Sequence, residues 1–248
     1  MVPNNRVLHI IHHFHPDIQV LLDALGLNVE MDRFYQAQSS VYKHLGLSES
    51  DASIKLKKNL VEKVDNLGFE KIEICLKVLF EETESLLANL LIVHHPLDGL
   101  LIGEWEKQYR LLGLEPHFLL LYTPVEWAVE NRVQRDIEAL KSNTKLIWQP
   151  LVLRKFQKRL AKRQQKYLQT WKDCMQGLII WTKETSSSYS FIEIEDINSE
   201  TNWEKFITSY NLNAISDFQE IQSRKQVGKY ADPEIQTIHE YFSRGLHD

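Results

Sequence analysis

Short apolar runs alternate along this chain with longer segments of helical periodicity, and this alternation most strongly limits the fold. The short runs are rich in Val, Ile, Leu or aromatic residues, which is typical of buried strands. The predicted strands are Val7–Ile11, Leu90–Val93, Phe118–Tyr122, Leu178–Trp181 and Phe191–Ile194. Strands separated by helices require crossover connections, so the pattern predicts an α/β fold with a mostly parallel central sheet and flanking helices.

The helical segments between these runs show apolar residues three and four positions apart. They are Asp17–Leu25, Arg33–Leu45, Ser50–Leu67, Glu70–Leu87, Leu100–Leu112, Val125–Leu140, Pro150–Gln176 and a C-terminal helix at about 232–243. The first β-α unit is followed by several helices and no strand, which predicts a helical insertion at about 27–87. With linker-like composition only near Thr185–Ser190, we interpret 1–248 as a single domain.

Composition excludes several classes of protein. The 248 residues are 43% hydrophobic and 25% charged, with a formal net charge of −5, so no global basic field attracts nucleic acid. Cys75 and Cys174 lack metal-ligand spacing and indicate thiols in a reducing compartment. No run reaches the roughly 18 apolar residues of a membrane span, and the N-terminus does not resemble a signal peptide. These features predict a cytoplasmic protein without a membrane span.

Histidines cluster at two places where a predicted strand ends. His12, His13 and His15 follow the first strand, and His94 and His95 follow the second. Ligands of parallel α/β sheets bind beyond the carboxyl ends of the strands, so the five imidazoles are expected at one crevice.

Three interpretations of these histidines stay open. They can be satisfied polar residues at strand–loop junctions. Neutral imidazoles of His13, His15 and His95 can bind zinc or a similar metal. Protonated imidazoles can bind an anion, with affinity that rises as the pH falls below about 6.5.

The order of the elements resembles that of the P-loop sulfotransferases, especially bacterial members that act on glycans. The matching pieces extend through most of the chain. They are Leu25-Gly26 after the first helix, the His94-His95-Pro96 turn, Trp105, the segment Gly113–Asp136, Trp171 in a long helix, FIEIEDI at Phe191–Ile197, and the tail Ser216–Phe242.

The resemblance implies a site for 3′-phosphoadenosine 5′-phosphosulfate. The family's phosphate-cradling loop falls on His12, His13 and Phe14, and its two residues for the donor's 3′-phosphate fall on Tyr122 and Glu130. The candidate catalytic groups are His15, His94 and His95, as the only possible general bases near the acceptor hydroxyl.

This chain departs from the family at each of those donor positions. The loop has no Gly, Ser or Thr, and Pro16 removes a backbone donor. The sequence therefore predicts a diverged sulfotransferase-like pseudoenzyme that does not use the standard donor. It would act as a binding or assembly module, with surface-polysaccharide biosynthesis as its context. The alternatives are a sulfotransferase or other transferase with a His-rich anion site, and a metal-dependent hydrolase that uses the His cluster.

A run of positive charge lies on the longest predicted helix, between 154 and 166. It comprises Arg154, Lys155, Lys158, Arg159, Lys162, Arg163 and Lys166. One interpretation is a solvated helix face, and the other is a patch for an acidic partner such as an anionic glycan or protein. No aromatic residues are interleaved on the basic face, so nucleic-acid binding is not favoured.

Overall fold

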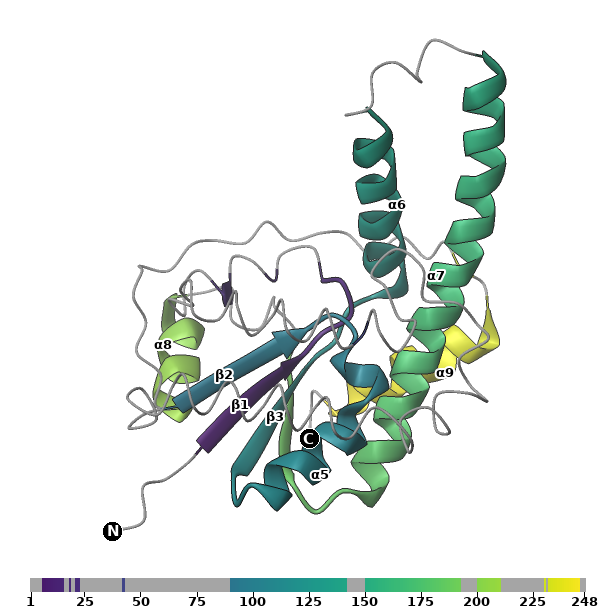
Figure 1. Ribbon diagram of the computed structural model, residues 1–248. Coiled ribbons are helices and arrows are strands. Elements are labelled where there is room, and N and C mark those ends of the chain that lie inside the picture. The colour runs from purple at the N-terminus through teal and green to yellow at the C-terminus, as the bar shows by residue number, and fades with distance from the viewer. Residues whose placement is uncertain are drawn as a thin grey trace.

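A computed structural model describes residues 6–15, 18, 21–22, 42, 90–141, 150–192, 200–210, 230 and 232–245. In this part of the chain, four parallel strands form one sheet in the order β2-β1-β3-β4. The strands are β1 (Arg6–Ile11), β2 (Leu90–His95), β3 (Glu115–Leu121) and β4 (Ser188–Ile192). The predicted α/β class with a parallel sheet is confirmed (Figure 1).

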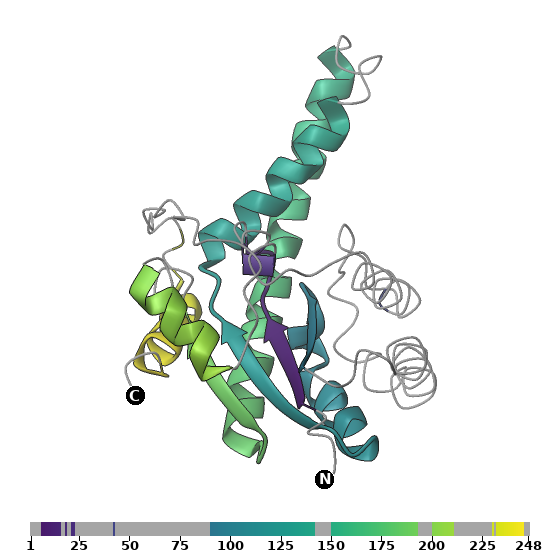
Figure 2. The ribbon, with the colours of Figure 1, turned by 90° about the vertical axis from the view of Figure 1, so that its left-hand side faces the viewer.

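Helices cover both faces of this sheet. They are the short 3₁₀ helix η2 (Asp98–Leu100), α5 (Ile102–Leu111), α6 (Val125–Lys141), α7 (Pro150–Glu184), α8 (Glu200–Ser209) and α9 (Pro233–Gly245). Side chains of α5, α7 and α9 share one hydrophobic core with Val7 and Ile11 of β1. Side chains of α8 pack with Leu8 and Ile10 on the opposite face (Figure 2).

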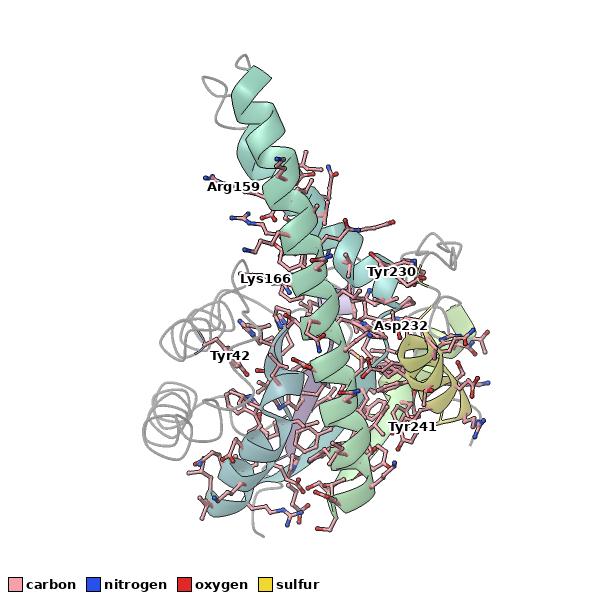
Figure 3. All side chains as sticks on the ribbon, turned by 90° about the vertical axis from the view of Figure 1, so that its right-hand side faces the viewer. Tyr42, Arg159, Lys166, Tyr230, Asp232 and Tyr241 are labelled. Atoms are coloured by element: carbon pink, nitrogen blue, oxygen red, sulfur yellow. The ribbon has the colours of Figure 1, made fainter. Side chains whose placement is uncertain are left out.

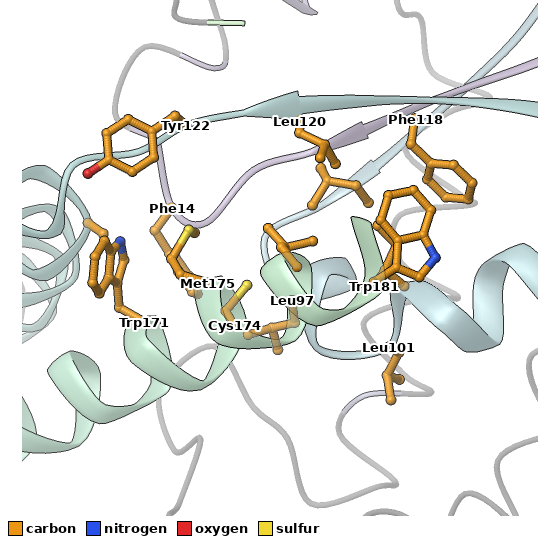
Figure 4. Close-up of a cluster of buried hydrophobic side chains, with 14 of the residues drawn as sticks. Phe14, Leu97, Leu101, Phe118, Leu120, Tyr122, Trp171, Cys174, Met175 and Trp181 are labelled. Atoms are coloured by element: carbon orange, nitrogen blue, oxygen red, sulfur yellow. The ribbon is translucent and has the colours of Figure 1, made fainter. Parts of the chain in front are cut away.

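Alternation along β1 explains this division, because successive side chains of a strand point to opposite faces. Val7, His9 and Ile11 belong to the larger core side, and Leu8 and Ile10 to the smaller one. The larger core is closed by aromatic and sulfur-bearing side chains of α7, including Trp171, Cys174 and Met175 (Figure 4).

One predicted strand is wrong. The run Leu178–Trp181 lies inside α7, which continues to Glu184. A short apolar run cannot be told from a buried helical segment by length alone. The burial pattern is helical, since Leu178 and Trp181 are buried while Ile180 between them is 57% exposed.

The other predicted elements agree in position but differ at their ends. β2 continues through His94 and His95, which were predicted to follow the strand. β4 begins at Ser188, inside the stretch with linker-like composition, and α8 was not predicted. Of the predicted insertion at about 27–87, only Tyr42 is among the described residues, and Cys75 lies outside them.

A carboxylate joins the end of α7 to α5. Glu106 accepts hydrogen bonds from Trp181 Nε1 at 2.7 Å, Thr185 Oγ1 at 2.7 Å and Ser187 Oγ at 2.6 Å. Burial raises the pKa of Glu106, but these donors and Arg110 offset it, so the pKa lies below its ordinary value. The contacts fix where α7 stops and where β4 begins.

The contact between η2 and α7 leaves no room for a side chain at Gly99. A Cβ at this position would lie 2.5 Å from Cys174 Sγ. We expect Gly99→Ala to lower the free energy of unfolding by about 1–3 kcal/mol because it overpacks the core. Urea denaturation measures this loss.

The matched control is Gly103→Ala on α5, where an added Cβ would meet nothing within 4 Å. This change is expected to stabilise the protein by about 0.5–1 kcal/mol. The double variant Gly99→Ala/Cys174→Ala should recover part of the lost stability. No recovery would show that the clash is not with Cys174.

Candidate functional site at the carboxyl edge of the sheet

A buried polar network lies at the carboxyl ends of β1 and β2. His9 Nε2 donates a hydrogen bond to Asp98 Oδ2 at 2.8 Å, and both side chains are 0% exposed. The hydroxyl of Tyr42 donates to Asp98 Oδ1, and Trp105 Nε1 donates to that hydroxyl at 3.0 Å. Tyr109 completes the network through a 3.0 Å hydrogen bond between its hydroxyl and His9 Nδ1.

Asp98 supplies the negative charge of this network. Burial alone raises the pKa of Asp98, but the charge and hydrogen bond of His9, the charge of His95 and the Tyr42 hydroxyl outweigh it. The pKa of Asp98 therefore lies below its ordinary value, and the carboxylate is ionised at neutral pH. A buried charge is tolerated only when it is paired and hydrogen-bonded, as it is here.

The adjacent histidines of β2 point to opposite faces of the sheet. The ring of His95 stacks on Tyr42 at a centroid distance of 4.5 Å, on the Asp98 side. Its Nδ1 accepts a hydrogen bond from the Leu97 amide at 3.2 Å. The ring of His94 instead lies 5.8 Å from that of His12. Strand alternation points the two rings to opposite sides, yet the charges of both His94 and His95, with those of His13 and His15, still act on the pKa of His12.

The loop after β1 is filled by its own side chains. His12, His13, Phe14 and His15 are between 0% and 4% exposed. Phe14 has a φ of 54°, a left-handed conformation that non-glycine residues rarely adopt. Its ring joins the larger core and its carbonyl accepts a hydrogen bond from Asn131 Nδ2 at 3.0 Å (Figure 4).

His13 has a defined tautomer. Its Nδ1 donates to the carbonyl of Pro96 at 3.1 Å, so the neutral ring presents the lone pair of Nε2. That Nε2 and both ring nitrogens of His12 are buried and have no hydrogen-bond partner among the described residues. Buried polar atoms are normally paired, so these three nitrogens indicate a place for a ligand or water.

The imidazoles of His12, His13 and His94 are uncharged at neutral pH. Burial, followed by the charge of Arg132, lowers the pKa of His13 to about 3. Burial also lowers the pKa of His12, and the charges of His94, His15, His95 and His13 lower it further. Burial likewise lowers the pKa of His94 to about 4, although the charge of Asp98 opposes this shift.

Arg132 brings a buried positive charge beside the loop. Its guanidinium carbon lies 4.2 Å from the centroid of the Phe14 ring and 4.0 Å from that of Tyr167. Asp136, one helical turn further along α6, accepts hydrogen bonds from Tyr167 at 2.6 Å and Arg163 at 2.9 Å. These contacts join the loop after β1 to α6 and α7.

The other positions implied by the resemblance do not join the histidines. The Tyr122 hydroxyl is 3.1 Å from His239 Nδ1, and the Tyr122 ring stacks on Phe242, so both contacts are with α9. Glu130 is exposed on α6. The ring of His15 packs at right angles to Trp127, with centroids 5.6 Å apart.

The described residues include no cluster of side chains that would support the metal-binding interpretation. In the described ranges, no group of three or more His, Cys, Asp or Glu side chains could hold a metal ion, and this includes His13, His15 and His95. The same part of the chain has no helix long and apolar enough to cross a membrane.

Sequence reasoning missed His9, Asp98, Tyr42 and Arg132. A signal existed for two of them. His9 interrupts an apolar strand at a core-facing position, and Asp98 follows the buried turn Pro96-Leu97 at the end of β2. A polar residue at such a position is expected to need a buried partner. The partnership itself spans 89 positions and could not be read from spacing.

No protein-family model, curated protein or solved structure matches this chain. The likeness to P-loop sulfotransferases therefore stays a prediction, while the parallel α/β architecture is directly observed.

The variant Asp98→Asn tests how much the buried network contributes to the free energy of unfolding. The amide keeps the shape of the side chain but removes the charge that faces His9, so we expect a loss of about 3–5 kcal/mol in the free energy of unfolding. The control is Glu240→Gln, which alters an exposed ion pair with Arg244 on α9. Equal losses in the two variants, measured by urea denaturation, would contradict a special role for Asp98.

The buried histidines predict a steep loss of stability in acid. His12, His13 and His94 have lowered pKa values in the folded protein, whereas they protonate near pH 6.5 when unfolded. Their contribution is therefore present above pH 6.5 and is lost as the pH falls. Each histidine adds a slope of about 1.4 kcal/mol per pH unit once the unfolded chain is protonated.

Urea unfolding between about pH 8 and pH 5 measures this slope. His13→Gln should reduce it by about 1.4 kcal/mol per pH unit. The control Gln236→Ala removes an exposed, uncharged side chain on α9 and should leave the slope unchanged. A wild-type stability that is flat across this range would show that the histidines are not held neutral.

Proposed function

We propose that this protein is a diverged relative of the P-loop sulfotransferases that does not use the phosphosulfate donor and acts as a binding or assembly module. By analogy with the glycan-acting members of that family, its context would be surface-polysaccharide biosynthesis. One observation carries the proposal. The loop that corresponds to the donor's phosphate cradle is filled by the buried side chains of His12, His13, Phe14 and His15.

A phosphosulfate needs a surplus of hydrogen-bond donors and positive charge. This loop presents the opposite at His13, whose Nδ1 proton is used by Pro96 and whose Nε2 is an acceptor. An acceptor lone pair repels an anionic oxygen. The ring of Phe14 also belongs to the core, so a phosphate could not approach the backbone there without unpacking it.

The same geometry favours a ligand that brings its own hydrogen. A hydroxyl or amide N–H can donate to His13 Nε2, and a neutral His12 can donate from one ring nitrogen and accept at the other. Hydroxyl-rich molecules, of which sugars are an example, meet this requirement without a buried charge. This chemistry supports a binding module better than a donor-dependent transferase.

The anion-binding transferase is disfavoured by the electrostatics. Binding through imidazolium groups would require protonation of His13 and His94, whose pKa values lie at about 3 and about 4. The expected gain in affinity below about pH 6.5 is therefore displaced to much lower pH. The metal-dependent hydrolase lacks a ligand cluster in the described part of the chain.

Isothermal titration calorimetry with 3′-phosphoadenosine 5′-phosphate at neutral pH tests the proposal. We expect no saturable binding below about 1 mM, which corresponds to about −4 kcal/mol. Saturable binding at micromolar concentration that is lost in His13→Gln, with Glu130→Gln as the exposed control, would overturn the proposal. One equivalent of zinc per purified chain, measured by elemental analysis, would instead favour the hydrolase.

A further inference from the structure

The N-terminal half of α7 stands away from the sheet. Together with the C-terminal part of α6, it extends beyond the carboxyl edge of the strands (Figures 1 and 2). The two helices are joined at the base of this extension by Asp136, which binds both Arg163 and Tyr167. The side of α7 that faces α6 therefore contacts α6 through these hydrogen bonds.

The other side of α7 carries four cationic side chains, which we name the basic stripe. They are Lys158, Arg159, Lys162 and Lys166. At 100° per residue these four positions fall within about 100° of the helix circumference, and Tyr167 lies on the opposite side. Lys158, Arg159 and Lys162 are exposed and Lys166 is partly exposed. Figure 3 shows Arg159 and Lys166 on the same side of α7.

No acidic side chain among the described residues neutralises the positive charge of the stripe. None of its four members forms an ion pair there, whereas Arg163 pairs with Asp136 at 2.9 Å. Arg163 was predicted as part of the same basic run, but it faces α6 and does not belong to the stripe. The stripe is therefore a local excess of positive charge on a chain whose net charge is −5.

We propose that the basic stripe binds a linear anionic polysaccharide. Lys158, Lys162 and Lys166 recur at successive helical turns, about 6 Å apart along the axis and about 12 Å in total. An extended polyanion with charged groups along its length can lie on this row and contact one cation at each turn. Such binding needs charge and exposure but no pocket, and the stripe has both.

The composition of the stripe distinguishes this partner from two others. Two exposed residues that flank the stripe, Ala161 and Gln165, supply no aromatic ring on which bases could stack. They also supply no large apolar side chain for the seam that a docked helix requires. Of these three kinds of contact, the residues of the stripe and its flanks favour an electrostatic contact with a flexible polyanion.

The test measures retention and affinity for heparin, a sulfated polysaccharide, as a function of salt. The triple variant Lys158→Gln/Lys162→Gln/Lys166→Gln removes three charges from the stripe. The matched control is Lys107→Gln/Lys183→Gln/Lys205→Gln, which removes three exposed charges that lie outside the stripe, on α5, at the C-terminal end of α7 and on α8. Equal urea midpoints for both variants and the wild type establish that folding is unchanged.

We expect the stripe variant to lose at least tenfold in affinity at about 50 mM salt, with a salt slope smaller by about 2–3, as for three lost ionic contacts. The control variant should bind like the wild type. Equal loss in both variants would overturn the proposal, because net charge alone would then explain binding. Absence of saturable binding by the wild type would overturn it as well.

Competition identifies the class of polyanion. Polygalacturonate, polyglutamate and a single-stranded oligothymidylate of matched charge are titrated against bound heparin. If polygalacturonate displaces heparin at a lower concentration of negative charges than the other two polymers do, the result supports a polysaccharide partner. Stronger displacement by polyglutamate or by the oligonucleotide would replace it with an acidic protein or a nucleic acid.

Discussion

The buried hydrogen bond between Asp98 and His9 holds the central strand β1 against the segment that follows β2, and the rest of the structure depends on this contact. His9 comes from the central strand and Asp98 from η2, just after the neighbouring strand, so their 2.8 Å hydrogen bond ties β1 to the turn that follows β2. Tyr42, Trp105 and Tyr109 extend the contact to other segments. Because neither side chain reaches solvent, the fold tolerates the Asp98 carboxylate only when its hydrogen-bond partners are present.

This network also influences the electrostatic environment of the histidines at the carboxyl edge of the sheet. Asp98 lies close enough to His94 to oppose the lowering of its pKa, while burial keeps that imidazole neutral at pH 7. His12 and His13 lie farther along the loop and gain no such support from Asp98. The result is a group of neutral rings that suit uncharged hydrogen-bonding ligands more than phosphate, which is the physical basis of the proposed binding role.

Much of the architecture could be predicted from local patterns. Three of the four observed strands largely coincide with expected apolar runs, and the long helix begins at Pro150 as expected. The errors arose where periodicity is ambiguous. Leu178–Trp181 is apolar enough for a strand, and Ser188 is polar enough for a linker, but packing against Glu106 and β3 decided both. The five predicted histidines lie at the carboxyl ends of β1 and β2, but His94 and His95 belong to β2 itself and do not follow it.

The sequence by itself determined the class of fold, the edge of the sheet at which polar residues gather, and the run of positive charge between 154 and 166. These depend on residue type and on short periodicities, which are local properties. Only the tertiary structure decided that Asp98 pairs with His9, and that His94 and His95 face opposite sides. It also decided that Arg163 pairs with Asp136, while Lys158, Lys162 and Lys166 form no ion pair with the described residues. The reason is physical. Burial, tautomer and ion pairing depend on which distant segments meet, and the register of parallel strands joined by long crossovers is set by packing.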